Sequence, residues 1–536
     1  HSLSMLFSAL CCIVVLLMLP EWTSSAKFPV VTTSYGSLKG YSFTAEDGTE
    51  AQIFKRIPFA SPPIGDLRWK KPQPHQPWNG TRDSTFFGPA CPQKSIVYDG
   101  SLSGFSEDCL HLNVYTSKDW LEPNSSCPVV FIIHGGLTLF EATMAFPDET
   151  LVRNFVSQGI VVVSTAYRLG VFGVMALGDE NVLPANLALH DVLAALKFTR
   201  QEIGHFGGDK ERITLLGHSA GGQIALMAAF SPGISKPGEK RLFNSVISMS
   251  GPSGLESQEE TVQRSHAFVT ELACEGSASE IMACLRVFDT ETIIDAAFKF
   301  LGKHVLSGKG PIGVTMAGEL FPINSQRELR ERKDPIRIMM GTTIFENPGT
   351  SEVGVERVSR FLGIENSEEC SAKYDVDTLS GQFVPGYDVV SQDIILTAHV
   401  FTKYQAEIGG EAYLYEYDYP VHGNHTQDAS FVLGYHQFET DENEKWLSHA
   451  YPRYFANFIK GQRPAPEWSP VTPLLMNYYS VNKSISDDVF PHTRYGYQKN
   501  LVTYYEGLVK YDNALSLVKN KILSAPVQYK SLNFDG

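Results

Sequence analysis

Short runs of consecutive apolar residues, many of them β-branched, recur along the chain and restrict its fold more than any other feature. They occupy residues 129–133, 160–164, 213–216, 246–249, 336–340 and 413–417, and most are apolar throughout. Strands of this kind must be covered on both faces. Between the second and third runs, Leu189, Val192, Leu193 and Leu196 follow helical spacing. Buried strands that alternate with amphipathic helices predict an α/β fold, with a mostly parallel central sheet wrapped by helices.

The chain of 536 residues contains no internal repeat, low-complexity tract or linker rich in Pro, Gly and Ser. We therefore expect residues 27–536 to form a single domain. Its 44 Lys and Arg against 59 Asp and Glu give a net charge of −15. Because such a surface repels polyanions, a role in binding nucleic acid is disfavoured. No sequence feature indicates an oligomeric state.

The N-terminal segment is typical of a secretory signal. Residues 6–19 are almost wholly apolar, but they are fewer than the roughly 20 residues that span a bilayer. The small residues up to Ala26 predict cleavage after that position, which makes residues 1–26 a signal peptide; an uncleaved anchor is the alternative. With no later membrane-spanning run, GPI tail or retention tetrapeptide, we expect an extracellular protein without stable membrane insertion. The lumen of the endoplasmic reticulum is the alternative location.

Two of the eight cysteines lie within the predicted signal peptide, and six follow it. In an oxidising compartment these six are candidates for disulfides. Two close pairs each enclose a short loop and are expected to form: Cys91 with Cys109, and Cys274 with Cys284. Spacing leaves open whether Cys127 and Cys370 pair or stay free.

A serine with a distinctive setting follows the run at residues 213–216. The sequence Gly217-His218-Ser219-Ala220-Gly221 is a G-x-S-x-G pattern between an expected strand and a helix-compatible stretch at residues 223–230. A serine on so sharp a turn has a strained backbone, and side chains two residues to either side would clash. The helix N-terminus also favours developing negative charge. This context predicts that Ser219 is a nucleophile.

Several segments together are similar to the type-B carboxylesterases, the cholinesterase-like branch of the α/β-hydrolases. They are residues 206–208 with 213–221, 107–114, 57–60, 62–65, 67–69 and 167–170. Including flanking matches, the resemblance runs from about Phe54 to Gly434, which is most of the chain. It implies an α/β-hydrolase fold and hydrolysis of esters without a metal or organic cofactor. The same fold also carries adhesion proteins that lack the serine.

The resemblance implies partners for Ser219, because a serine hydroxyl needs a histidine to take its proton and an acid to orient that histidine. The family's acid corresponds to Glu346, although the family usually has glycine where Asn347 follows. The family's histidine corresponds to His425, with His422 as the nearby alternative. Ser250 resembles the hydroxyl that steadies the acid.

The implied oxyanion hole is where the chain departs most from the family. His134-Gly135-Gly136-Leu137-Thr138 stands where the family has His/Tyr-Gly-Gly-Gly-Phe, and the implied donors are the backbone amides of Gly136, Leu137 and Ala220. If the position of Leu137 requires positive φ, leucine costs about 1–2 kcal/mol there. Otherwise only the shape of the pocket changes.

The resemblance also implies two buried ion pairs, Arg68 with Glu107 and Arg168 with Asp191.

Four N-glycosylation sequons begin at Asn79, Asn124, Asn424 and Asn482. We expect glycans on some of Asn79, Asn124 and Asn482. Asn424 is expected to be too enclosed beside His425 and to remain unmodified.

Cholinesterases place a tryptophan in the first disulfide loop and a glutamate before the serine, and this chain has neither. The predicted substrate is therefore an uncharged or lipid-like small-molecule ester. The sequence predicts a secreted serine carboxylesterase that forms an acyl-enzyme on Ser219. The alternative, favoured by Leu137 and Asn347, is a catalytically impaired or inactive adhesion or binding protein.

Overall fold

The computed structural model describes residues 28–94, 104–121, 125–236, 238–305, 313–323, 327–330, 334–346 and 355–524. The predicted signal peptide, Asn124 and Asn347 lie outside these residues.

The six apolar runs form the centre of one sheet, as predicted. They correspond to β7 (Cys127–Ile133), β8 (Val161–Thr165), β9 (Gly208–His218), β10 (Ser245–Met249), β13 (Arg337–Thr343) and β14 (Ala412–Tyr417). Neighbouring strands among these six pair in parallel. The mostly parallel core of the α/β prediction is therefore confirmed.

Further strands extend this sheet on both sides, and the sequence runs did not reveal them. The eleven strands found in the described residues lie in the order β3-β4-β6-β8-β7-β9-β10-β13-β14-β15-β16. The added strands are β3 (Tyr41–Thr44), β4 (Glu50–Pro58), β6 (His111–Thr116), β15 (Asn477–Val481) and β16 (His492–Tyr495). Strand β15 pairs in parallel with β14, whereas the other added strands pair antiparallel with their neighbours. Strand β3 alternates half-buried and exposed residues and β16 is mostly exposed, because an edge strand need not be apolar on both faces.

Helices cover both faces of the central strands. Val129, Phe131 and Ile133 of β7 belong to a core shared with α4 (Leu187–Glu202) and α5 (Ala220–Phe230). Val130 and Ile132 face a second core with α2 (Asp148–Asn154), α13 (Gln427–Leu433) and α14 (Glu442–Ile459). This arrangement explains why the strands are apolar throughout: neither face meets water.

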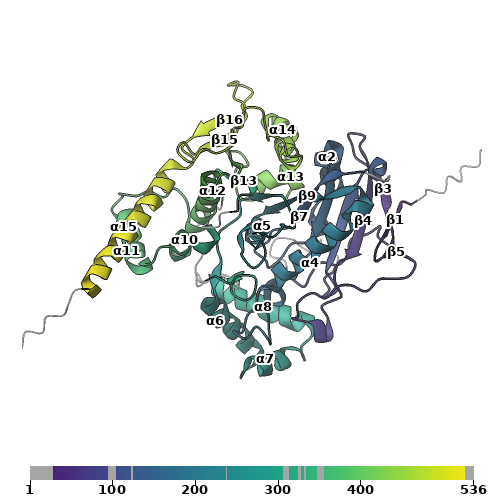
Figure 1. The fold of residues 1–536 in the computed structure, drawn as a ribbon, viewed down its shortest axis with the longest axis horizontal. Helices are drawn as coiled ribbons and strands as arrows, with labels where there is room; N and C mark the ends of the chain where they lie inside the picture. The colour runs from purple at the N-terminus through teal and green to yellow at the C-terminus, as the bar shows by residue number, and fades with distance from the viewer. Residues whose placement is uncertain are drawn as a thin grey trace, which may run out of the picture.

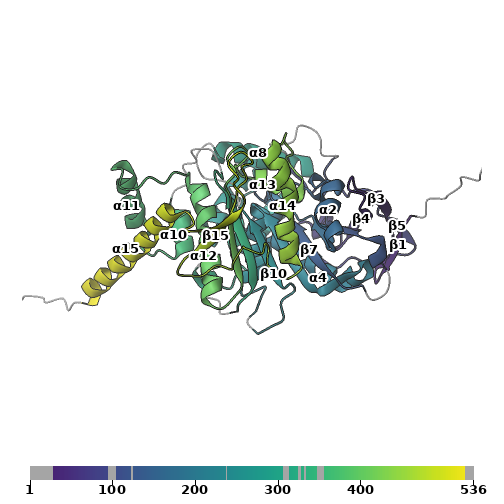
Figure 2. The same cartoon turned by 90° about the horizontal axis from the view of Figure 1, so that it is seen from above.

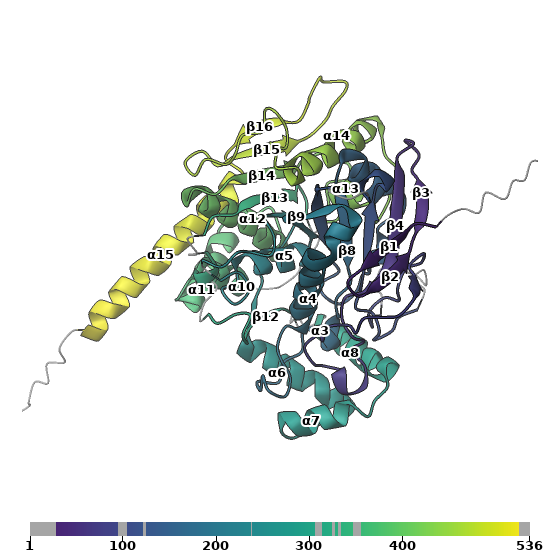
Figure 3. The same ribbon diagram turned by 45° about the vertical axis from the view of Figure 1, so that its right-hand side comes forward.

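The remaining elements lie at the periphery. Figures 1 and 2 show α15 and the N-terminal strands at opposite ends of the molecule, and Figure 3 shows α6, α7 and α8 grouped at one end, away from β15 and β16. Their bounds, with those of the other minor elements, are β1 (Val30–Thr33), β2 (Gly36–Lys39), β5 (Thr81–Asp83), α3 (Gly170–Gly173), β11 (Glu256–Ser257), α6 (Gln258–Val269), α7 (Ala278–Leu285), α8 (Thr290–Val305), β12 (Thr315–Met316), α9 (Arg327–Arg330), α10 (Glu356–Leu362), α11 (Ser367–Leu379), α12 (Val389–Glu407) and α15 (Lys499–Ser524). In the described part of the chain, no helix has the length and apolar character needed to cross a bilayer.

Both expected disulfides form, Cys91 with Cys109 and Cys274 with Cys284. Cys127 and Cys370, whose pairing the sequence left open, are free thiols.

Both ion pairs implied by the resemblance are present. Arg68 binds Glu107 through two hydrogen bonds from its guanidinium. Arg168 donates to both oxygens of Asp191 at 2.7 Å, and its backbone amide donates to the same carboxylate at 3.1 Å. Asp191 is fully buried and lies on α4, so this pair ties the loop after β8 to the helix that covers the sheet.

Replacing Asp191 with alanine should destabilise the fold strongly, because it leaves the Arg168 charge buried without a partner. We expect the free energy of unfolding to fall by about 3–5 kcal/mol, measured by urea denaturation. The control is Glu239→Ala, which removes an exposed pair with Lys236 and should change stability by less than about 0.5 kcal/mol. Equal effects of the two substitutions would contradict a structural role for the buried pair.

Candidate active site

Ser219 lies on a backbone turn that only a glycine-flanked residue can make. Its φ of 54° and ψ of −124° fall outside the regions that non-glycine residues normally occupy. A Cβ on Gly217 would lie 2.1 Å from the Gly221 carbonyl oxygen, and one on Gly221 would lie 2.1 Å from that of Ile133. The structure thus shows the clash expected from the G-x-S-x-G pattern and locates it against β7.

Three distant side chains meet beyond the carboxyl ends of the central strands. Ser219 follows β9, Glu346 follows β13 and His425 follows β14. The Nε2 atom of His425 is 3.0 Å from Ser219 Oγ, and its Nδ1 atom is 2.6 Å from Glu346 Oε2. All three residues implied by the resemblance are therefore brought together by hydrogen bonds.

Glu346 is held from several directions. Its side chain is fully buried, and Oε1 accepts hydrogen bonds from Ser250 Oγ and from the Thr343 backbone amide, both at 2.7 Å. The backbone amide of His425 donates to the Glu346 carbonyl oxygen at 2.5 Å. Ser250 thus lies where the resemblance implied, whereas no sequence pattern indicated the contribution of Thr343.

The surroundings of His425 favour its charged form. Burial lowers the pKa of His425, but the hydrogen bond and charge of Glu346, with the charges of Asp428 and Asp388, outweigh burial and raise that pKa above its ordinary value. His422, the alternative candidate for the base, has different partners. Its Nδ1 atom is 2.6 Å from Glu444 Oε1, and its ring stacks on that of Phe438.

His218 is a second buried imidazole beside this group. Its ring centroid lies 5.0 Å from that of His425. Burial, together with the charges of His425 and His436, holds the pKa of His218 well below its ordinary value. The residue before the serine is therefore neutral at neutral pH, unlike the glutamate of cholinesterases.

The sequence did not single out Asp428 as a site residue, although it ends the segment that identified His425. Burial and then the charge of Glu346 raise the pKa of Asp428 to about 7. Its Oδ2 atom accepts a hydrogen bond of 2.9 Å from the Tyr451 hydroxyl. Asp428 therefore shares a buried region with Glu346, and its charge helps to raise the pKa of His425.

The loop after β7 approaches the serine closely. A Cβ on Gly135 would lie 3.3 Å from Ser219 Cβ. Gly136 and Leu137 have φ of 83° and 56°, so leucine occupies the left-handed conformation that costs it about 1–2 kcal/mol. Among the described residues, none accepts a hydrogen bond from the backbone amides of Gly136, Leu137 or Ala220, which leaves all three donors available.

Ser219 and His425 line a cavity of about 730 Å³, a size typical of small-molecule sites. Much of its wall is apolar. Its acidic side chains are Asp388 and Glu141, and Glu141 Oε1 lies 3.3 Å from His436 Nε2. The apolar lining residues are Leu137, Phe140, Pro252, Val390, Ile394 and Phe438.

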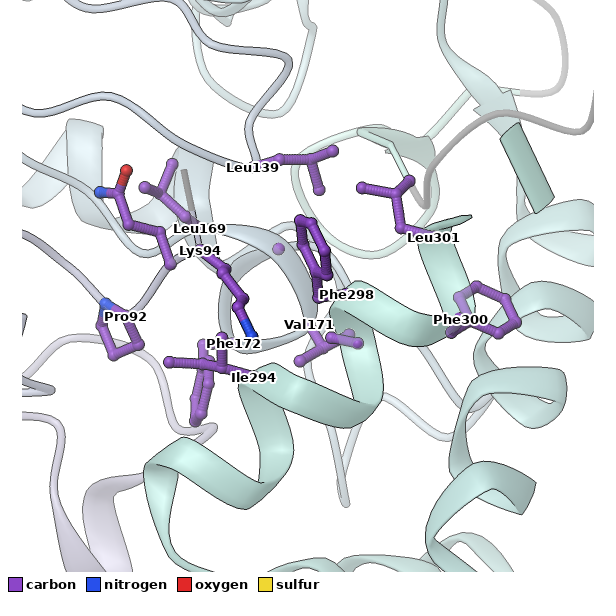
Figure 4. Close-up of a pocket in the computed structure, with 13 residues that line it drawn as sticks. Pro92, Lys94, Leu139, Leu169, Val171, Phe172, Ile294, Phe298, Phe300 and Leu301 are labelled. Carbon is purple, nitrogen blue, oxygen red and sulfur yellow. The ribbon is translucent and has the colours of Figure 1, made fainter. Parts of the chain in front are cut away.

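Leu139, from the same loop, lines a separate and smaller pocket. This pocket measures about 70 Å³ and is lined mainly by apolar side chains, including Leu139 and residues of α8 such as Phe298 and Leu301 (Figure 4). It is too small for a typical organic ligand, and it contains none of the Ser219, His425 and Glu346 group. In the part of the chain that is described, no three His, Cys, Asp or Glu side chains are placed to hold a metal ion.

The sequons differ in exposure. Asn79 is exposed, and Asn482 is half-buried with its side-chain amide bound to the Asp418 carbonyl oxygen. Asn424 is half-buried and lines the cavity that contains Ser219. Whether a glycan is attached at Asn424 stays a prediction.

Comparison with known proteins identifies the family. Residues 27–500 match the family described as the Carboxylesterase family. The chain belongs to the carboxylesterase family. It is accordingly a carboxylic ester hydrolase.

Relatives of this carboxylesterase support the assignment. It is 35% identical to juvenile hormone esterase of Tribolium castaneum over 279 residues, covering 51% of this chain and 46% of the relative. It is 27% identical to carboxylesterase 1C of Rattus norvegicus over 511 residues, covering 85% and 89% of the two chains. The crystal structure of juvenile hormone esterase from Manduca sexta shares the fold, with a TM-score of 0.75 at 22% identity, covering 90% of this chain and all of that one. The α/β-hydrolase architecture is thereby confirmed.

Gly221→Ala should disrupt the carboxylesterase site, because the new Cβ would overlap the Ile133 carbonyl oxygen and push the serine turn away from β7. We expect a loss of about 1–3 kcal/mol in stability and a large fall in ester hydrolysis. In the control, Gly507→Ala within α15, the added Cβ meets no heavy atom within 4 Å and should stabilise the protein by up to about 1 kcal/mol. Unchanged hydrolysis by Gly221→Ala would refute the steric requirement.

Proposed function

We propose that this carboxylesterase is a secreted serine esterase that works through an acyl-enzyme on Ser219. Ser219 Oγ attacks the carbonyl carbon of a small-molecule ester while His425 Nε2 takes the hydroxyl proton. Glu346 orients His425 and stabilises the imidazolium that forms. His425 then returns the proton to the leaving alcohol, and a water molecule, activated by the same histidine, hydrolyses the acyl-enzyme and releases the acid.

The oxyanion of each tetrahedral intermediate is stabilised in this proposal by the amides of Gly136, Leu137 and Ala220. Hydrogen bonds aimed at developing charge are among the largest contributions to such reactions. No metal or organic cofactor enters the scheme.

The observation that carries the proposal is the hydrogen-bond chain from Glu346 through His425 to Ser219, with distances of 2.6 Å and 3.0 Å. A binding or adhesion protein would have no need of a buried carboxylate that Ser250 and Thr343 anchor behind a histidine. This argument favours hydrolysis over the alternative function.

Leu137 is the observation that favours the alternative, because it replaces a glycine at positive φ. The substitution retains the backbone amide, however, and even complete loss of one such donor slows catalysis by about 10²–10³-fold without abolishing it. The proposed function therefore tolerates Leu137.

Secretion is part of the proposal. The family match begins at residue 27, directly after the predicted cleavage site, and the two disulfides suit an oxidising compartment. We propose glycans on some of Asn79, Asn124 and Asn482, and none on Asn424.

An uncharged ester is the proposed substrate class. No tryptophan is among the described residues that line the cavity, and the neutral His218 stands before the serine. The chain therefore lacks the two groups by which cholinesterases attract a quaternary ammonium, the tryptophan of the first disulfide loop and the glutamate before the serine. Similarity to proteins named juvenile hormone esterase and carboxylesterase 1C supports an organic ester.

Labelling with a fluorophosphonate tests the nucleophile, because the reagent reacts with an activated serine. Wild-type protein should be labelled stoichiometrically, Ser219→Ala should not be labelled, and Ser486→Ala, which alters an exposed serine, should behave as wild type. Folded wild-type protein that resists the reagent would favour the binding function. Labelling that survives Ser219→Ala would show that another residue is the nucleophile.

The pH dependence of kcat/KM tests the histidine and its acid. Because His425 must be neutral to take a proton and its pKa is raised, activity should be lost as pH falls through a value above the ordinary histidine pKa of about 6.5. Glu346→Gln should move this acid limb to lower pH and reduce kcat by about 10²–10⁴-fold. Glu444→Gln, which changes the matched carboxylate beside His422, should leave the limb in place; a shift with that variant instead would assign the base to His422.

A further inference from the structure

Leu137 is much more exposed to solvent than neighbouring residues of its loop. The residue is 51% exposed, whereas Thr138 and Phe140 are 2% and 9% exposed. It faces the cavity that contains Ser219 and His425. An apolar side chain of this size, exposed on a left-handed backbone, is unfavourable on both counts in the absence of a ligand. Backbone strain and exposed apolar surface of this kind concentrate at functional sites, where contact with a substrate can offset them.

The position of the Leu137 side chain relative to a substrate follows from its backbone. If the Leu137 amide donates to the carbonyl oxygen at roughly 2.9 Å, its Cβ, two bonds from that nitrogen, lies within a few ångströms of the groups on the carbonyl carbon. The alcohol oxygen must face His425, which returns a proton to it. The α-carbon of the acyl group is then the substituent on the carbonyl carbon that remains to face the loop.

We propose that Leu137 is a specificity-determining residue. Its isobutyl group packs against the α-carbon of the acyl group, next to the scissile carbonyl, and selects esters that are unbranched at that carbon. The inference rests on the proposed serine mechanism. A glycine at this position would leave that space open, so the side chain restricts the cavity next to the reacting bond although the cavity as a whole is large. Straight acyl chains fit beside Leu137, whereas a quaternary carbon overlaps it.

The neighbouring Leu139 provides a matched control. It lies on the same loop, but its side chain lines the separate apolar pocket with Phe298 and Leu301 of α8 (Figure 4). Shortening Leu139 disturbs the loop without enlarging the catalytic cavity. Any effect that comes from loosening the loop should therefore appear in Leu139→Ala as well.

The experiment compares p-nitrophenyl acetate with p-nitrophenyl trimethylacetate, which share a leaving group and differ only in branching at the α-carbon of the acyl group. The quantity measured is the ratio of kcat/KM for trimethylacetate to that for acetate. We expect this ratio to rise at least tenfold in both Leu137→Gly and Leu137→Ala and to stay within twofold of wild type in Leu139→Ala. A ratio, unlike a rate, is insensitive to any uniform loss of active protein.

The two Leu137 variants separate side-chain volume from backbone strain. Alanine removes the isobutyl group but keeps the penalty of positive φ, whereas glycine removes both. A rise in Leu137→Gly alone would attribute the effect to the backbone and overturn the proposal, as would an equal rise in Leu139→Ala or an unchanged ratio in both Leu137 variants. A wild-type enzyme that hydrolyses neither ester and takes up no fluorophosphonate would instead overturn the serine mechanism, and the role of Leu137 with it.

Discussion

The close approach of backbone at the serine turn is the constraint on which the rest of the site depends. Gly217 and Gly221 let β9 turn into α5 against the end of β7, with no room for a Cβ at either position. The turn forces Ser219 into a strained conformation and holds it at the N-terminus of a buried helix. Because the surrounding strands and helices are packed on both faces, the fold as a whole can hold this strain.

Charge in the site is arranged so that one buried carboxylate acts on one histidine. Glu346 is enclosed and hydrogen-bonded through Ser250, Thr343 and His425, so its charge is directed at the imidazole rather than at solvent. His218 adds no competing charge, because burial keeps it neutral. A low-dielectric setting strengthens each of these interactions.

Leu137, a departure from the family pattern, lies on the wall of the cavity rather than in the hydrogen-bond chain. Leu137 stands where the family has glycine, and His218 stands where cholinesterases have glutamate, yet hydrogen bonds link Ser219, His425 and Glu346. Such a division is expected when a shared chemistry is combined with a different choice of substrate.

The sequence by itself determined the buried parallel strands and the serine turn, because both depend on neighbouring residues: apolar runs for the strands and glycines for the turn. It could not identify the strands at the margins, because segments such as β3 and β16 mix polar and apolar residues and carry no such pattern. Family resemblance was needed to choose His425 over His422. Only the tertiary structure shows which histidine contacts the serine. His425 and Ser219 are 206 positions apart in the sequence, so their contact depends on the order of the strands in the sheet. It also decided the positive φ of Leu137 and the support of Glu346 by Thr343, which arise from packing between segments.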